Sequence, residues 1–264
     1  MILTVDIGNT HIHLGLFIRG ALRKTWSIAS TPQRTSDEYA LLMRGLVGES
    51  MPLQGAIVSS VVPSLELPIA RAIEQEYKAM PLILSEKTPI GIVNGYRHPA
   101  EVGMDRLANA AGGFYMYGAP LLILDFGTAI TLDYVAPPKN EGAMPVYMGG
   151  AIMPGIEMAA QALAKGTARL PQVPLTEPEH VIGRTTAESI QAGLLHGYYG
   201  AINTLVERSK EEIGQACDVI ATGGDALNLR RHLPFLRAVE PDLTLYGLRQ
   251  IYGLNFNCPL PPRR

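Results

Sequence analysis

Hydrophobic and polar residues alternate in two stretches of the chain, and each stretch is interrupted by an aspartate followed closely by a glycine. In residues 1–17, the alternation and the β-branched side chains predict a strand, a turn at Asp-Ile-Gly-Asn-Thr (6–10) and a second strand. Residues 121–135 repeat this arrangement around Asp-Phe-Gly-Thr (125–128). Two such hairpins about 120 residues apart predict a duplicated domain whose hairpin tips face one cleft.

Shorter patterns predict further strands and helices around these hairpins. Strands are expected at residues 21–28, 55–62, 81–84, 143–148, 218–221 and 235–239, and helices at residues 65–77, 104–114, 187–213 and 244–255. Another helix begins near Ser36, whose hydroxyl suits the N-cap position before Asp37 and Glu38. The segment that starts at Gly91 is expected to be loop, and residues 259–264 a frayed tail.

This order of elements is typical of an α/β fold with mixed five-stranded sheets flanked by helices. Because the hairpin recurs, we expect two halves, residues 1–115 and residues 116–264, packed together without a flexible linker.

Composition restricts the classes of function. The 264 residues are 47% hydrophobic and 17% charged with a formal net charge of −2, so the basic excess typical of nucleic-acid-binding or membrane-surface proteins is absent. Two cysteines without C-x-x-C spacing argue against a disulfide framework or a zinc site. The N-terminus has no basic region and no run approaches ~18 apolar residues, so we expect a cytoplasmic protein without a signal peptide.

The first hairpin turn carries residues suited to binding a nucleotide. Gly8 permits a tight turn and the close approach of a ligand, while Asp6, Asn9 and Thr10 supply acceptors and donors on short side chains. Such a tip can hold a hydrated cation and the phosphates that it neutralises. The alternative is a polar turn whose side chains only satisfy the backbone; the repeated turn at residues 125–128 favours the ligand.

Three further segments allow two readings each. Asp105 and Arg106 lie at the start of a predicted helix, where amide groups favour anions, but taken alone an acidic first turn with a solvated arginine is the commoner arrangement. Gly149-Gly150 before a predicted helix, and Thr-Gly-Gly-Asp at residues 222–225, permit close approach of a ligand such as adenine or ribose. Both are also common in tight turns.

Five motifs, taken together in this order and spacing, strongly resemble type III pantothenate kinase. They are residues 6–10 (Asp-Ile-Gly-Asn-Thr), 103–106 (Gly-Met-Asp-Arg), 125–131 (Asp-Phe-Gly-Thr-Ala-Ile-Thr), 149–155 (Gly-Gly-Ala-Ile-Met-Pro-Gly) and 222–225. That family, also known through the Bvg accessory factor, is a branch of the acetate and sugar kinase/actin superfamily. The resemblance implies duplicated actin-like, ribonuclease-H-like domains and the ATP-dependent phosphorylation of pantothenate to 4'-phosphopantothenate, the first step of coenzyme A biosynthesis. It also implies Mg²⁺ with ATP, and activation by K⁺ or NH₄⁺.

The resemblance assigns roles to particular residues. The implied ATP site comprises Asp6, Ile7, Gly8, Asn9, Thr10, His11, Ile12 and His13, with Thr128 from the second hairpin. The implied pantothenate site comprises Tyr96, Gly103, Met104, Asp105, Arg106 and Thr186. Asp105 matches the catalytic proton acceptor, Asp125 the ligand of the monovalent cation, and Asp6 the residue that holds Mg²⁺ through ATP. Thr185 competes with Thr186 for the substrate contact, and neither His11 nor His13 is given a chemical role.

Other functions compatible with the motifs are another small-molecule kinase or an ATPase of the same fold, and a non-catalytic regulatory relative. Retention of Asp6, Asp105 and Asp125 favours an enzyme. The resemblance and the apolar face of residues 187–213 predict a homodimer formed chiefly by helices of the second half, with Thr186 of one chain reaching the pantothenate of its partner. Expected partners are therefore ATP, pantothenate and a second copy, with no nucleic acid and no membrane.

Overall fold

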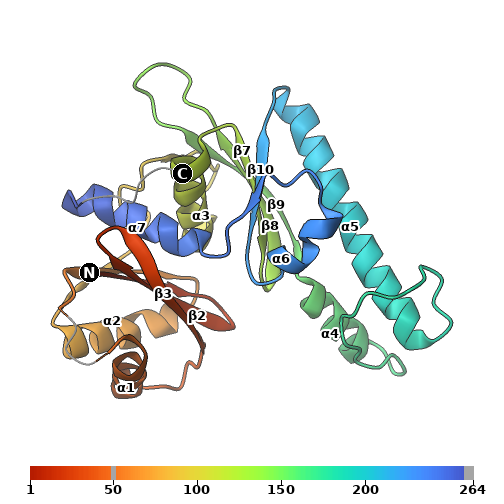
Figure 1. Cartoon of the computed structure of the whole chain (residues 1–264), viewed down its shortest axis with the longest axis horizontal. Coiled ribbons are helices and arrows are strands. Elements are labelled where there is room, and N and C mark those ends of the chain that lie inside the picture. Colours follow the sequence, from red (N-terminus) through yellow and green to blue (C-terminus); the bar gives the residue numbers. More distant parts are fainter. Residues whose placement is uncertain (49–51, 259–264) are drawn as a thin grey trace. The chain divides into compact units, whose positions relative to one another are not determined.

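The computed structural model describes residues 1–48 and 52–258, which form two compact units (Figure 1). The first unit comprises Met1–Ala119, Val135–Gly149 and Asp242–Arg264, and the second comprises Pro120–Tyr134 and Gly150–Pro241. The division into duplicated halves at residues 1–115 and 116–264 rests on the repeated hairpin and stays a prediction. The tail predicted at residues 259–264 lies outside the described residues.

A mixed five-stranded sheet organises the first unit. Its spatial order is β3 (Ala21–Ala29), β2 (His11–Ile18), β1 (Ile2–Ile7), β4 (Gly55–Ser60) and β5 (Pro81–Ile83). The central strand β1 runs antiparallel to β2 and parallel to β4. The carboxyl end of β1 therefore lies beside the carboxyl end of β4, and this is where Asp6 stands.

One face of this sheet is covered by α1 (Ser36–Val47) and α2 (Pro63–Tyr77) (Figure 1). Alternate residues of β1 enter a core with the inward faces of both helices, as period-two alternation requires. Members of this core with no exposed surface include Leu3, Val5, Ile7, Tyr39, Met43, Leu65 and Ile69.

The cap of α1 differs from the prediction. Thr35, and not Ser36, is the N-cap residue: its hydroxyl accepts a hydrogen bond from Glu38 N at 3.3 Å, and the Glu38 carboxylate accepts one from Thr35 N at 2.7 Å. This reciprocal capping box needs threonine and glutamate three residues apart. Only Thr35 has a glutamate at that spacing, so Ser36 becomes the first helical residue.

Two helices cover the other face of the sheet. α3 (Met104–Tyr117) and α7 (Leu243–Phe256) pack against each other, and α7 also contacts β1, β2 and β4. Their backbones approach closely because glycines meet at the crossing: a Cβ at Gly112 would lie 2.9 Å from Gly247 N. A hydrogen bond of 2.7 Å from Thr244 Oγ1 to Asn109 Oδ1 joins the two helices in their buried interface. This pairing fixes the helix whose first turn carries Asp105.

The second sheet is also mixed, with one strand more than predicted. Its order is β11 (Ala238–Val239), β10 (Asp218–Thr222), β7 (Leu121–Phe126), β8 (Ala129–Ala136), β9 (Val146–Pro154) and β6 (Val93–Asn94). The sixth strand, β6, and a 3-10 turn at Pro99–Glu101 lie in the segment that was expected to be loop. β6 pairs in parallel with the first two residues of β9, inside the first unit. The predicted fold class, two mixed sheets flanked by helices, is confirmed.

The strand predicted at residues 143–148 runs on to Pro154, so the glycine pair at residues 149–150 lies within β9 and not in the approach to the helix. A Cβ at Gly150 would collide with the carbonyl oxygen of Leu132 on β8, and Gly149 has a φ of +98°. Close strand approach and a left-handed backbone therefore require these glycines. The helix predicted after this segment is observed as α4 (Ile156–Gly166), with Gly155 as its N-cap residue.

The long helix α5 (Thr186–Ile213) covers the sheet of the second unit (Figure 1). Its inward side chains Leu195, Tyr198, Ile202 and Val206 share a core with Leu122, Leu124, Ile130 and Leu132. A short helix, α6 (Ala226–Leu229), follows β10. Across residues 1–48 and 52–258, we find no helix with the length and apolar character needed to cross a membrane.

Candidate functional site

The tip of the β1–β2 hairpin is held by backbone bonds, while its polar side chains face outward. Gly8 N donates to His11 O at 2.9 Å and closes the turn. Ser30, directly after β3, braces the tip, because its Oγ donates to Gly8 O at 2.5 Å and its N donates to Thr10 O at 2.9 Å. Asn9 and Thr10 are exposed. The tip is therefore a fixed loop that presents amide and hydroxyl groups outward.

Asp6 stands at the base of this tip. Its register partners are His13 on β2 and Ser59 on β4, and both its own Oδ1 and the side chain of Ser59 are buried. The side chains of Ile7 and Ile12 have no exposed surface and belong to the core. Any contribution of these two isoleucines to the predicted ATP site must therefore come from their backbone groups.

The two histidines of the hairpin lie on one face of β2, with ring centroids 6.1 Å apart. Desolvation, followed by the neighbouring His11, lowers the pKa of His13, while Asp242 acts in the opposite direction. His13 is therefore neutral near pH 7 and adds no positive charge for a phosphate. Within residues 1–48 and 52–258, no group of three His, Cys, Asp or Glu side chains is arranged to hold a metal.

Gly103 to Arg106 form the start of α3, with Gly103 as the N-cap residue. Asp105 Oδ1 accepts a hydrogen bond from Arg106 N at 2.8 Å, which orients the carboxylate. A side chain at position 103 would collide with that same oxygen, so glycine leaves the room that Asp105 occupies. Met104 is the first helical residue and is half-buried.

One residue connects this helix start to the first hairpin. Val61 N donates to Ile7 O at 3.0 Å, which continues the β1–β4 pairing past the end of β4. The Cγ1 atom of Val61 also lies 3.6 Å from the position a Cβ at Gly103 would take. The end of β1 and the first turn of α3 are therefore separated by the width of a single valine.

The predicted substrate residues Tyr96 and Arg106 come together through Tyr147, which the sequence analysis did not select. Arg106 Cζ lies 5.8 Å from the centroid of the Tyr147 ring, and that ring lies 6.4 Å from the ring of Tyr96. Tyr96 in turn covers Gly149, where a Cβ would lie 2.7 Å from its ring. The available sequence signal was an aromatic residue two positions before the glycine pair, and aromatic residues are ordinary in strands. Only the structure shows that Tyr147 is fully buried.

In the second unit, two glycine-containing segments pack against the turn of the β7–β8 hairpin. Gly155 N donates to Thr128 O at 2.9 Å, and a Cβ at Gly155 would lie 2.5 Å from the carbonyl oxygens of Gly127 and Thr128. Gly223, with a φ of +92°, packs against the backbone of Phe126. Asp125 lies at the end of β7, in register with Thr222. Gly155 and Gly223, which belong to two of the glycine motifs, therefore pack directly against the turn of the second hairpin.

Asp225 follows the turn at Gly223. Desolvation and then the nearby Glu157 raise the pKa of its carboxyl above the usual range. Additional negative charge at this turn is thus unfavourable, whereas a hydrogen-bond donor, such as a ribose hydroxyl, would be favourable.

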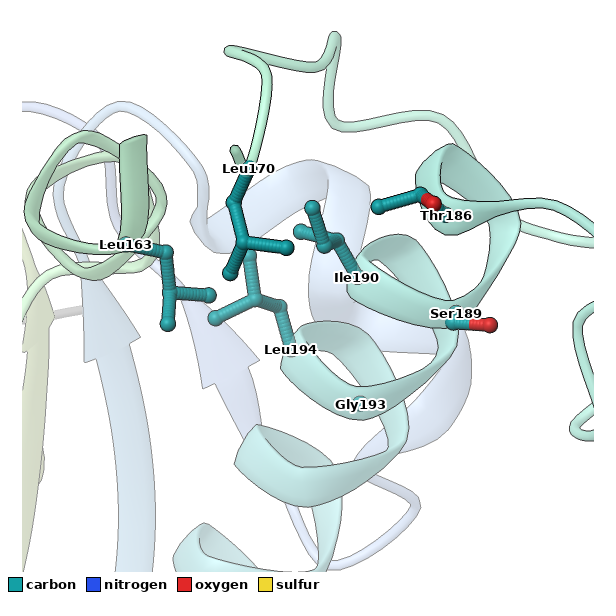
Figure 2. Close-up of a pocket in the computed structure, with 7 residues that line it drawn as sticks. All are labelled: Leu163, Leu170, Thr186, Ser189, Ile190, Gly193 and Leu194. Carbon is teal, nitrogen blue, oxygen red and sulfur yellow. The ribbon is translucent and has the colours of Figure 1, made fainter. Parts of the chain in front are cut away.

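The structure distinguishes the two threonines at the start of α5. Thr185 is the N-cap residue, whose hydroxyl accepts a hydrogen bond from Glu188 N at 3.2 Å. Thr186 is exposed and lines an open apolar pocket of about 290 Å³ between α4 and α5 (Figure 2). In Figure 2 the side chains of Leu163, Leu170, Ile190 and Leu194 point toward one another, with Thr186 at their edge. Because Thr185 serves the helix, Thr186 remains the better candidate for a ligand contact.

The candidate residues therefore form two groups. Those of the first unit are Asp6, Gly8, Asn9, Thr10, His11, His13, Tyr96, Gly103, Met104, Asp105 and Arg106. Those of the second unit are Asp125 and Thr128 on the β7–β8 hairpin, and Thr186 at the start of α5.

A comparison with models of known protein families shows to which family the chain belongs. A model of the type III pantothenate kinase family matches residues 2–208, which include both hairpins and the first turn of α3. The chain belongs to the type III pantothenate kinase family.

Solved structures agree with this family at the level of the fold. A conserved protein from Campylobacter jejuni, described as a Baf family transcriptional activator, is similar with a TM-score of 0.62 and 18% identity, covering 97% of this chain and 99% of its own. The ethanolamine utilization protein EutJ from Carboxydothermus hydrogenoformans is similar with a TM-score of 0.50 and 13% identity, covering 96% and 88%.

Membership of the type III pantothenate kinase family makes this protein a kinase that uses ATP and a small-molecule acceptor. All five motif segments belong to elements described above. The family match ends at residue 208 and so leaves out the Thr222–Asp225 turn, which the structure places against the second hairpin.

Proposed function

We propose that this protein transfers the γ-phosphoryl group of ATP to the primary hydroxyl of pantothenate, with Asp105 as the general base. The observation that carries the proposal is the single-valine separation between the end of β1 and the first turn of α3. A phosphate-binding hairpin and an oriented carboxylate so close together suit phosphoryl transfer, in which positioning and charge neutralisation supply most of the catalysis.

The nucleotide side of the proposal rests on the first hairpin. Magnesium is commonly held by one or two carboxylates together with substrate phosphates and water, and not by a protein cage. Asp6 is suited to such a site, because it is a single carboxylate at the base of a tip rich in amide groups. Among the described residues, no three His, Cys, Asp or Glu side chains are grouped so that they could hold a metal ion by themselves. Mg²⁺ bound there would neutralise the β- and γ-phosphates. Asn9, Thr10 and Thr128 would donate to phosphate oxygens.

The acceptor side rests on α3 and the two tyrosines. Arg106 presents a planar guanidinium suited to an anionic or amide oxygen of pantothenate, and Tyr96 would cover the bound molecule. As the substrate hydroxyl oxygen forms its bond to the γ-phosphorus, the bond to the β–γ bridging oxygen breaks and ADP leaves. The hydroxyl proton passes to Asp105.

We extend the proposal to a monovalent cation and a second copy of the chain. Asp125, at the second hairpin turn, would repel a polyphosphate unless a cation such as K⁺ or NH₄⁺ lay between them.

The apolar pocket beside Thr186 supports a homodimer in which α4 and α5 contribute contacts, and Thr186 would then reach the partner's pantothenate. Sedimentation showing a fully active monomer at micromolar concentration would contradict the dimer. A cytoplasmic location accords with coenzyme A biosynthesis.

The decisive experiment is a coupled ADP-release assay with and without pantothenate, on the unmodified protein and on Asp105→Asn. Asparagine can accept the same hydrogen bond from Arg106 N, so the helix start should persist while the basic charge is lost. We expect kcat to fall by roughly 10²–10⁴-fold, with ATP affinity and melting temperature retained.

Three outcomes would change the proposed function or the role of Asp105. A near-normal kcat for Asp105→Asn would reduce Asp105 to a residue of the helix start. ADP release stimulated by a different alcohol, and not by pantothenate, would make the protein another kinase of this fold. No release with any acceptor would favour a non-catalytic regulatory relative.

A further inference from the structure

The guanidinium of Arg106 lies against an aromatic side chain that belongs to none of the five motifs. Arg106 is only 8% exposed, and its Cζ is 5.8 Å from the centroid of the fully buried Tyr147 ring. The Tyr147 ring is 6.4 Å from that of Tyr96, at an interplanar angle of 42°. Tyr147 is therefore a neighbour of both predicted substrate-binding side chains.

Strand pairing fixes this arrangement. Gly95 N donates to Tyr147 O at 2.9 Å, and Val93 N donates to Pro145 O at 2.8 Å. These bonds set the register of β6 on β9. Asn94 pairs with Tyr147, and Tyr96 lies two residues after Asn94. A side chain at Gly95 would come within 3.0 Å of Tyr147 O, so glycine permits the close approach. The same short ladder thus positions both rings.

A buried guanidinium is stabilised by the negative face of an aromatic ring. An arginine also has several rotatable bonds, and a ring packed against its planar end removes alternative rotamers. An arginine ordered in this way loses less conformational entropy when it binds a ligand. Leucine in place of Tyr147 would fill much of the space without providing the ring face.

We propose that Tyr147 is a positioning residue that holds Arg106 in the orientation in which its guanidinium recognises the acceptor substrate. The inference rests on the proposed function, in which Arg106 contacts an anionic or amide oxygen of pantothenate. Tyr147 does not touch the reacting atoms; it acts through Arg106 and supports the ring of Tyr96.

Steady-state kinetics of Tyr147→Leu test the proposal. An interaction that binds substrate equally in the ground and transition states affects KM more than kcat. We expect the KM for pantothenate to rise on the order of 5- to 30-fold, the KM for ATP to stay within about twofold, and Tyr147→Phe, which keeps the ring, to restore the KM for pantothenate.

A matched control separates positioning from loss of core packing. Tyr39 is also fully buried in the first unit, and its hydroxyl donates to Thr31 O at 3.1 Å, on the face of the sheet that carries α1. Tyr39→Leu should lower the melting temperature about as much as Tyr147→Leu but leave the KM for pantothenate unchanged. If the two variants alter that KM equally, Tyr147 is only a core residue and the proposal fails.

Two further measurements keep the proposal open to refutation. If Tyr147→Leu does not fold, phenylalanines with one, two or three ring fluorines at position 147 keep the shape while weakening the ring's negative face. The KM for pantothenate should then rise with each added fluorine, and an unchanged KM across the series overturns the proposal.

Arg106→Lys should lose less activity in the Tyr147→Leu protein than in the unmodified one, whereas additive losses would contradict coupling between Arg106 and Tyr147.

Failure of this inference differs from failure of the proposed function. If the unmodified protein phosphorylates pantothenate but Tyr147→Leu leaves its KM unchanged, only the role of Tyr147 is wrong. If the unmodified protein does not phosphorylate pantothenate, the function fails first and the inference fails with it.

Discussion

Replacing Gly155 with alanine tests whether the second hairpin turn must stay where the structure holds it. Gly155 has a φ of −65° and a ψ of 156°, which alanine adopts without strain, so only the new methyl group matters. That methyl carbon would lie 2.5 Å from the carbonyl oxygens of both Gly127 and Thr128. Ordinary carbon–oxygen contacts begin near 3.4 Å, so the turn would have to retreat by about 0.9 Å.

The size of the effect follows from this displacement. Overpacking of this kind typically costs about 1–3 kcal/mol of stability, and the hydrogen bond from Gly155 N to Thr128 O would be stretched as well. If Thr128 donates to a phosphate of ATP, a shift of nearly 1 Å should lower kcat/KM for ATP by up to ~10²-fold. The acceptor site in the first unit should keep its KM for pantothenate.

Thermal unfolding and initial rates at saturating pantothenate measure both effects. Gly166→Ala, at the other end of α4, is the matched control, because a Cβ there meets no atom within 4 Å. It should leave the kinetics unchanged and raise the stability by a few tenths of a kcal/mol to ~1 kcal/mol. If Gly155→Ala behaves like Gly166→Ala, the turn yields freely and the reasoning is wrong.

Three further predictions concern a helix cap, a thiol and the cation. Thr35→Ala should lower the free energy of unfolding by about 1 kcal/mol and Ser36→Ala by clearly less, since only Thr35 caps α1; equal losses would argue against the capping box. Burial raises the pKa of Cys217 to about 11, so at pH 8 roughly one thiol in a thousand is ionised. In a variant whose other cysteine is serine, alkylation should therefore accelerate about tenfold per pH unit from pH 8 to 10, and a plateau near pH 9 would contradict the burial. Asp125→Asn should abolish the response to K⁺ together with most activity, and equal rates of the unmodified protein in Na⁺ and K⁺ would refute the cation site.

Both hairpins were predictable because their signals are local. Alternation over a few residues, followed by aspartate and glycine, specifies a strand and a turn without any distant contact. The long helix α5, of 28 residues, was predicted for the same reason: its buried positions recur at helical spacing from Ile190 to Val206, and only its first residue differed. The first turn of α3 was likewise placed correctly, with Met104 as its first residue.

The features that could not be predicted from the sequence depend on pairing between distant segments. β6 is two residues long, too short for any periodicity, and forms only because β9 offers an edge to which Val93 N and Gly95 N donate hydrogen bonds. The helix that begins at Ile156 was predicted, but the position of the glycine pair at residues 149–150 inside β9 depends on the close approach of Leu132 on β8. Tyr147 was missed because a buried tyrosine acquires meaning only from the side chains around it.

The pairing of β1 determines where the length of this protein can vary. Each residue from Ile2 to Ile7 has a register partner on β2 and another on β4. Loss of one residue within β1 would move its core residues to the opposite face and turn Asp6 away from the hairpin base. The segment at residues 137–144, which lies between β8 and β9 and is mostly exposed, has no register partner on any described strand. A library of single-codon deletions and insertions, sorted for folded protein, should therefore be depleted throughout β1 and populated between β8 and β9, and survivors with deletions inside β1 would contradict a fixed register.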